Sequence, residues 1–138
     1  MSSWTDKRPM SPHMQVWRWH VTMAGSILHR ATGCANYVGA ILAVVWLASA
    51  ASGYEAYNLF ATLAATPLGQ LVWFGFTVSV CYHTLNGVRH FVWDIGHGFT
   101  PKLASLTGWI VIGLALVMAV AVWVLAGLVP GINPLGVR

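Results

Sequence analysis

Long stretches without charged residues dominate the pattern of apolar and polar positions along this chain. Each of them can hold the roughly 20 apolar residues that cross about 30 Å of hydrocarbon. These stretches cover residues 31–54, 56–88 and 103–137. The pattern predicts an all-α membrane protein with three transmembrane helices at about residues 22–50, 67–96 and 105–129.

Residues that break helices support these divisions. Ser52-Gly53 closes the first predicted helix, Pro67 opens the second, Gly96-His97-Gly98 follows it, and Pro130-Gly131 ends the third. The sequence contains no repeat, so we expect one domain over residues 1–138. Residues 1–21 lack the apolar core of a cleavable signal peptide and are expected to form a polar N-terminal arm.

Composition and charge fix the environment and the orientation. Hydrophobic residues make up 57% of the chain, charged residues only 7%, and the mean hydropathy is +0.68, which excludes an ordinary soluble domain. Basic residues lie at or before the start of the first helix (Lys7, Arg8, Arg18, Arg30) and around the second loop (Arg89, Lys102), but the first loop has none. This asymmetry predicts a cytoplasmic N-terminus and explains the net charge of +4 without a nucleic-acid partner.

A polar stripe follows the second predicted helix. At 100° per residue, His83, Gly87, His90 and Asp94 fall within roughly 60° of one another. An ionisable residue at membrane depth is a functional hypothesis by default, and a neutral imidazole is a common ligand of haem iron. Gly87 leaves room for the edge of a porphyrin. The alternative is a histidine bonded to a neighbouring helix, with Gly87 as a packing notch.

The first predicted helix carries a second polar stripe. Its members share one side of the helix within roughly 100°: Thr22, Ser26, His29, Arg30, Gly33 and Tyr37. A hydroxyl, an imidazole and a guanidinium together can hold a carbonyl or a carboxylate. The alternative is that His29 and Arg30 only reach toward lipid headgroups. The presence of a facing stripe on the second helix favours a binding site.

Three blocks of sequence carry a resemblance to a known family. They are Arg8-Pro9-Met10-Ser11-Pro12-His13-Met14, Ser26-Ile27-Leu28-His29-Arg30-Ala31-Thr32-Gly33 and His83-Thr84-Leu85-Asn86-Gly87-Val88-Arg89-His90-Phe91-Val92-Trp93-Asp94. In order and separation these blocks closely resemble those of the cytochrome b subunits of succinate dehydrogenase, the larger membrane anchors of respiratory complex II.

The resemblance implies roles for the polar residues. By it, His83 is the axial ligand of haem b, and Ser26 and Arg30 belong to the ubiquinone pocket. His29, Arg30 and His90 are expected on the side of the haem propionates. Gly87, Arg89 and Asp94 also match positions of the family motif. For these residues the resemblance implies a location near the cytoplasmic end of the second helix more than a particular role.

The resemblance also implies partners. A flavoprotein with FAD oxidises succinate, an iron-sulfur protein conducts the electrons, and two small anchors bind one shared haem b and reduce ubiquinone. The chain is expected to act as a subunit of that enzyme without catalysing flavin chemistry itself. This chain offers only His83 at its depth in the membrane, so we expect the second anchor to supply the other haem ligand.

Other functions and another location stay open. A quinol-oxidising anchor of fumarate reductase, or another membrane cytochrome b, would use the same haem and helices. A three-helix assembly protein without redox activity would use the polar stripes only for helix contacts. The lack of a transit peptide favours a bacterial inner membrane over a mitochondrial one.

Overall fold

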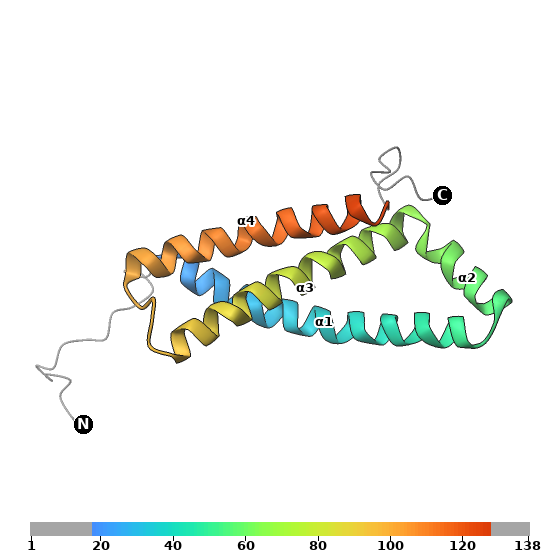
Figure 1. The fold of residues 1–138 in the computed structure, drawn as a ribbon, viewed down its shortest axis with the longest axis horizontal. Coiled ribbons are helices and arrows are strands. Elements are labelled where there is room, and N and C mark those ends of the chain that lie inside the picture. Colours follow the sequence, from blue (N-terminus) through green and yellow to red (C-terminus); the bar gives the residue numbers. More distant parts are fainter. Residues whose placement is uncertain (1–17, 128–138) are drawn as a thin grey trace, which may run out of the picture.

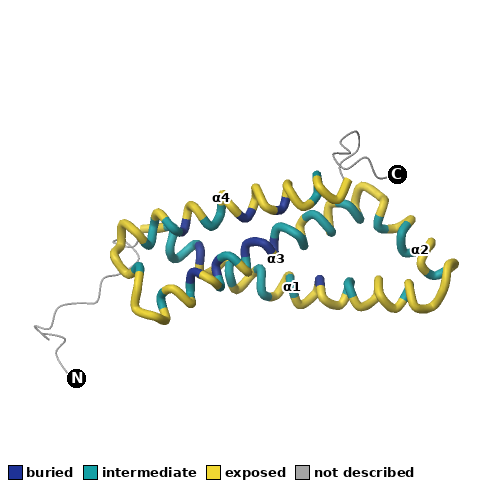
Figure 2. Tube along the Cα trace, viewed as in Figure 1, coloured by how far each residue is buried: buried dark blue, intermediate teal, exposed yellow. Residues whose placement is uncertain are grey.

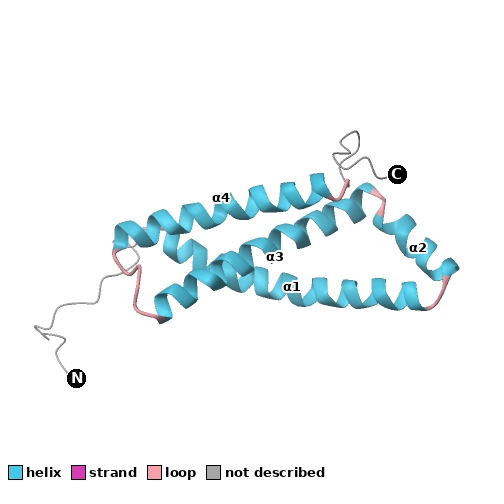
Figure 3. Ribbon diagram, in the orientation of Figure 1, coloured by secondary structure: helices cyan, strands magenta, loops and turns pink. Residues whose placement is uncertain are grey.

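The computed structural model describes residues 18–127, and in this range it is helical and contains no strand (Figure 3). The helices are α1 (Val21–Ala51), α2 (Tyr54–Ala64), α3 (Pro67–Asp94) and α4 (Pro101–Leu125). Most of the predicted N-terminal arm, the block Arg8 to Met14 and the stop at Pro130-Gly131 lie outside the described residues. The all-α prediction is confirmed.

The three predicted long helices correspond to α1, α3 and α4, with small differences at their ends. Helix α3 ends at Asp94 rather than at residue 96, because Gly96 turns the chain with φ of 87°. Helix α4 begins at Pro101 rather than at residue 105, since proline is well suited to the first turn of a helix.

Helix α2 was not predicted from the sequence, which indicated only a loop there. Gly53 separates it from α1 with φ of 107°, a conformation that favours glycine. The eleven residues that follow begin with an acidic residue in the first turn, Glu55, and contain no proline. Thr66 then caps α3 by accepting a hydrogen bond from the amide of Gly69 at 3.1 Å, next to Pro67.

Two of the long helices are apolar enough to cross a membrane by themselves. Helices α1 and α4 meet this requirement by length and composition, whereas α3 meets it only together with α2, from which it is bent by 84°. The described residues therefore supply two candidate spans, or three if the bent pair counts as one. The difference arises because α3 carries the polar stripe that contains His83.

Helix α3 lies between α1 and α4, and α2 joins α1 to α3 at one end of the bundle (Figure 1). Buried positions gather on α3 and on the sides of α1 and α4 that face it, while α2 has none (Figure 2). Small residues make this close approach possible. A side chain at Gly39 would collide with the ring of Phe76, and Ala115 and Ala119 are at most 1% exposed.

Polar side chains connect the helices. Ser79 donates to Asn36 Oδ1 at 2.7 Å or to the carbonyl of Thr32 at 3.1 Å, which joins α3 to α1. Trp123 Nε1 donates to Thr77 Oγ1 at 3.1 Å, which joins α4 to α3. Hydrogen bonds of this kind stabilise helix contacts where burial of apolar surface drives association weakly, as it does in a bilayer.

Candidate functional site

The imidazole of His83 is held by a threonine of the neighbouring helix. Thr32 Oγ1 on α1 lies 3.2 Å from His83 Nδ1 on α3. The Thr32 hydroxyl proton is already directed at the backbone carbonyls of Leu28 (2.8 Å) and His29 (3.0 Å). With its proton given to these carbonyls, the Thr32 oxygen is free to accept from His83; in that arrangement the proton is on Nδ1 and the lone pair of Nε2 is left for another partner.

Two further imidazoles lie near His83: one stacks on it, and the other contacts the first. The ring of His29 stacks on the ring of His83 with 4.0 Å between centroids and 13° between planes. His90 lies 5.3 Å from His29, and its ring meets Trp93 edge-on at 5.1 Å. His29 Nδ1 is buried and has no hydrogen-bond partner among the described residues. The structure thus brings together three of the predicted site residues, from both polar stripes.

Glycines shape the space around His83. At Gly33, a Cβ atom would lie 3.3 Å from Cε1 of His83, so a larger residue would push the imidazole away from α1. At Gly87, one turn after His83, a Cβ atom would meet nothing within 4 Å. The helix surface at Gly87 is therefore open, and it leaves room for the edge of a planar group.

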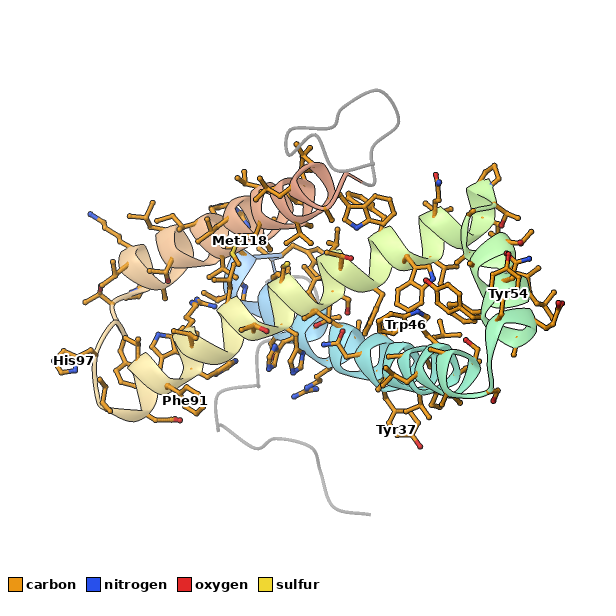
Figure 4. All side chains as sticks on the ribbon, turned by 45° about the vertical axis from the view of Figure 1, so that its right-hand side comes forward. Tyr37, Trp46, Tyr54, Phe91, His97 and Met118 are labelled. Atoms are coloured by element: carbon orange, nitrogen blue, oxygen red, sulfur yellow. The ribbon has the colours of Figure 1, made fainter. Side chains whose placement is uncertain are left out.

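Ser26 and Arg30 are exposed residues of α1, and the described residues offer neither side chain a hydrogen-bond partner. Tyr37, from the same predicted stripe, is 73% exposed and points away from the bundle (Figure 4). Asp94 is the exposed last residue of α3 and forms no ion pair within residues 18–127. These residues are accessible from outside the chain rather than gathered into a closed pocket.

Arg89 is buried against α4, contrary to the prediction that it flanks the second loop. It was counted among the charges around the second loop, but it is only 7% exposed and lies inside the contact between α3 and α4. A signal for this was present in the sequence: Tyr82, Asn86 and Arg89 are spaced four and three residues apart, so they share one buried face of α3. This second polar face was missed.

Two cavities in the described part of the chain do not contain the predicted site residues. One, of about 460 Å³, lies near α2, and half of the residues that line it are aromatic, including Trp46 (labelled in Figure 4), Trp73 and Trp123. The other, of about 540 Å³, lies near the turn between α3 and α4 and is lined in part by His20 and Trp93. Neither includes His83, Ser26 or Arg30, whose surroundings are an open face.

The donor set on this face suits a haem better than a bare metal ion. No group of three or more histidine, cysteine or acidic side chains among the described residues is arranged to hold a metal. A haem iron, whose four equatorial ligands belong to the porphyrin, needs only an axial imidazole from the protein. His83, with Nδ1 engaged and the open strip at Gly87 below it, meets this requirement.

Comparison with known proteins agrees with this chemistry. Residues 5–122 match the family described as "Succinate dehydrogenase/Fumarate reductase transmembrane subunit". The succinate dehydrogenase cytochrome b556 subunit of Rickettsia prowazekii (strain Madrid E) is 37% identical over 119 residues, which cover 86% of this chain and 93% of that protein.

Two further relatives have similar identities. The cytochrome b556 subunit of Rickettsia typhi (strain ATCC VR-144 / Wilmington) is 35% identical with the same coverage. The mitochondrial succinate dehydrogenase cytochrome b560 subunit of Sus scrofa is 36% identical over 115 residues, which cover 82% of this chain and 68% of that protein.

The chain therefore belongs to the family of succinate dehydrogenase and fumarate reductase transmembrane subunits. Within it, the similar proteins bear the names of succinate dehydrogenase cytochrome b subunits, which confirms the resemblance seen in the sequence. The chain is a helical membrane protein of this family, and roles in binding haem and quinone fit it.

Proposed function

We propose that this chain is the cytochrome b membrane anchor of a succinate:quinone oxidoreductase. In this proposal it crosses the membrane three times with its N-terminus in the cytoplasm, provides one axial ligand to haem b, and forms part of the site where quinone is reduced. The apolar helices α1 and α4, the bent pair α2 and α3, and the family of the chain support this assignment.

The observation that carries the proposal is the hydrogen bond between His83 and Thr32. An imidazole that ligates a metal through Nε2 usually donates its other N–H to an oxygen, which fixes the tautomer and the orientation of the ring. The 3.2 Å contact from His83 Nδ1 to Thr32 Oγ1 has this form. When bound, the haem supplies a one-electron store beside the quinone, and this chain's part is to hold and orient it.

The second axial ligand is proposed to come from the second small anchor subunit. A six-coordinate haem needs imidazoles on both faces of one porphyrin. Helix α4 contains no histidine, His90 lies about 10.5 Å further along α3 than His83, and His29 stacks on His83 itself. His29 lies beside His83. We propose that the haem propionates face His29, Arg30 and His90.

The quinone site is proposed at Ser26 and Arg30. Reduction of a quinone to a quinol takes two electrons and two protons, so negative charge develops on its carbonyl oxygens and must be stabilised. Ser26 can donate a hydrogen bond to one oxygen, and Arg30 can stabilise the charge without losing its own proton. Both side chains are exposed on α1, so a quinone can reach them from the lipid.

Electrons for this reaction are proposed to arrive from two soluble partners. A flavoprotein with FAD removes them from succinate, and an iron-sulfur protein carries them to the membrane. We place the assembly in a bacterial inner membrane, because several of the similar proteins belong to Rickettsia species.

The experiment that tests this proposal is the replacement His83→Ala in the whole complex. The expected result is loss or strong perturbation of the reduced-minus-oxidised haem b spectrum, while oxidation of succinate by a soluble dye persists. His97→Ala is the matched control, since among the described residues the His97 side chain bonds only to the backbone carbonyl of Ile95, near the end of α3. An unchanged haem spectrum in His83→Ala would refute the assignment of the ligand.

A fumarate reductase anchor is the second candidate, since the family includes both enzymes. It would oxidise quinol and deliver electrons to fumarate, with the same residues on the membrane side. The ratio of succinate-quinone to fumarate-quinol turnover of the purified complex separates the two. The names of the similar proteins favour succinate oxidation.

A further inference from the structure

Arg89 is a buried cation for which the described residues supply no anion. Arg89 is 7% exposed, and its side chain lies inside the contact between α3 and α4. The acidic residues of the described range are Glu55 and Asp94, and neither forms an ion pair. Burial of an unpaired charge is costly, so such a group in a membrane protein calls for an explanation.

Neutral groups alone hold the Arg89 guanidinium in place. Nε donates to Thr107 Oγ1 at 3.1 Å, Nη2 donates to the carbonyl of Ala104 at 2.6 Å, and Nη1 donates to Asn86 Oδ1 at 3.3 Å. The guanidinium carbon also lies 4.1 Å from the centre of the Trp93 ring. These contacts fix the position of the charge without neutralising it.

The charge lies close to both helices of the proposed site. A Cβ atom at Gly25, the residue before Ser26, would lie 3.8 Å from Nη1 of Arg89. Tyr82, the neighbour of His83 in sequence, donates to the carbonyl of Gly25 at 2.9 Å. Arg89 follows His83 by six residues, or about 9 Å along the axis of α3.

We propose that Arg89 is a fixed electrostatic element that raises the reduction potential of the haem held by His83. This inference rests on the proposed function. Reduction of ferric to ferrous haem adds one electron, which the iron-sulfur partner supplies, and a nearby positive charge favours the reduced form. Arginine is suited to this role because it does not lose its proton.

Coulomb's law gives the size of the effect. For two unit charges on the order of 10 Å apart and an effective dielectric constant of about 20, the ratio of reduced to oxidised haem at a fixed potential changes on the order of tenfold. For a one-electron couple, a tenfold change corresponds to about 59 mV in midpoint potential.

The decisive variant is Asn86→Asp in the complete complex. The aspartate has nearly the same shape as the asparagine and places a carboxylate against Nη1 of Arg89, so it cancels the charge and keeps the contact. It also removes the amide Nδ2 of Asn86, a buried donor without a partner among the described residues. We expect the midpoint potential to fall by the equivalent of about a tenfold change in the ratio of reduced to oxidised haem.

Asn58→Asp is the matched control, because it adds the same charge on the exposed surface of α2. It should leave the midpoint potential unchanged, since water screens an exposed charge. Arg89→Lys keeps the charge and should retain the wild-type potential, whereas Arg89→Gln should lower it. The absorption spectrum of the haem should stay the same in all four variants, because the iron ligands are untouched.

Several results would overturn the proposal. The midpoint potential of Asn86→Asp could differ from that of the wild type by less than the equivalent of a twofold change in the ratio of reduced to oxidised haem. That result would show that the haem does not respond to this charge. If the midpoint potential fell equally in Arg89→Lys and Arg89→Gln, the effect would come from the shape of the arginine side chain and not from its charge. Loss of haem from both Asn86→Asp and Arg89→Gln would make Arg89 a packing residue. Failure of the proposed function would be seen separately, as an unchanged haem spectrum in His83→Ala.

Discussion

Replacing Thr32 by valine tests the hydrogen bond that orients His83. Valine has nearly the same shape as threonine but no hydroxyl, so His83 Nδ1 loses the oxygen that lies 3.2 Å from it. Without this acceptor, the tautomer that exposes the lone pair of Nε2 is no longer favoured, and the ring is freer to turn. We expect weaker haem binding in a complex that still assembles.

The expected loss follows from the hydrogen bond that Thr32 makes with His83. A net hydrogen bond is worth about 0.5–1.5 kcal/mol, and leaving its half-buried donor unsatisfied adds to that. Removing the oxygen that orients a metal-ligating histidine typically lowers metal affinity by about 10- to 100-fold. We therefore expect haem to leave the Thr32→Val complex about 10 to 100 times faster than the wild type.

Transfer of haem from the purified complex to excess apomyoglobin measures this rate. Thr32→Ser keeps the hydroxyl and should behave like the wild type. Thr62→Val is the matched control, because Thr62 makes the same kind of bond to a carbonyl one turn back, that of Asn58 at 2.8 Å, on the exposed helix α2. Haem release from Thr32→Val within twofold of the control would refute the role assigned to Thr32.

Other predictions concern the quinone and the helix contacts. Ser26→Ala or Arg30→Leu should depress quinone reduction by about one to two decades while the dye-linked oxidation of succinate stays intact; equal loss of both activities would instead indicate failed assembly. Gly39→Ala should destabilise the bundle by about 1–3 kcal/mol, because its Cβ would collide with Phe76. Gly75→Ala, which meets nothing within 4 Å, is the control, and equal thermal stability of the two variants would contradict the packing.

The long helices and the histidine stripe were accessible from the sequence for simple physical reasons. A stretch without charge that ends at glycine or proline shows where a helix runs, as at Pro67 and Gly96. The angular spacing of His83 and His90 placed them on one side of α3. The facing stripe on α1 contains His29, and in the structure its ring stacks on that of His83 and lies 5.3 Å from that of His90.

Other features depend on contacts that helical spacing does not specify. Thr32 acquires its role only because α1 approaches α3 closely at Gly33, and this distance is set by packing. Arg89 looked like a loop charge because basic residues near helix ends usually are. Its burial follows from acceptors on α4, Thr107 and the carbonyl of Ala104, 15 to 18 residues away in sequence.

The lengths of α1 and α3 have a consequence for where the polar chemistry occurs relative to the lipid. With 31 and 28 residues, these helices are about 46 and 42 Å long, against about 30 Å of hydrocarbon. Such a hydrophobic mismatch is relieved by tilt or by helix ends that extend into the headgroup layer. Ser26 and Arg30 lie about 8 and 14 Å from the first residue of α1. In the proposed arrangement, an overhang of this size at that end of α1 would keep the guanidinium in the wet headgroup layer, while the remaining two thirds of the helix would cross the acyl chains.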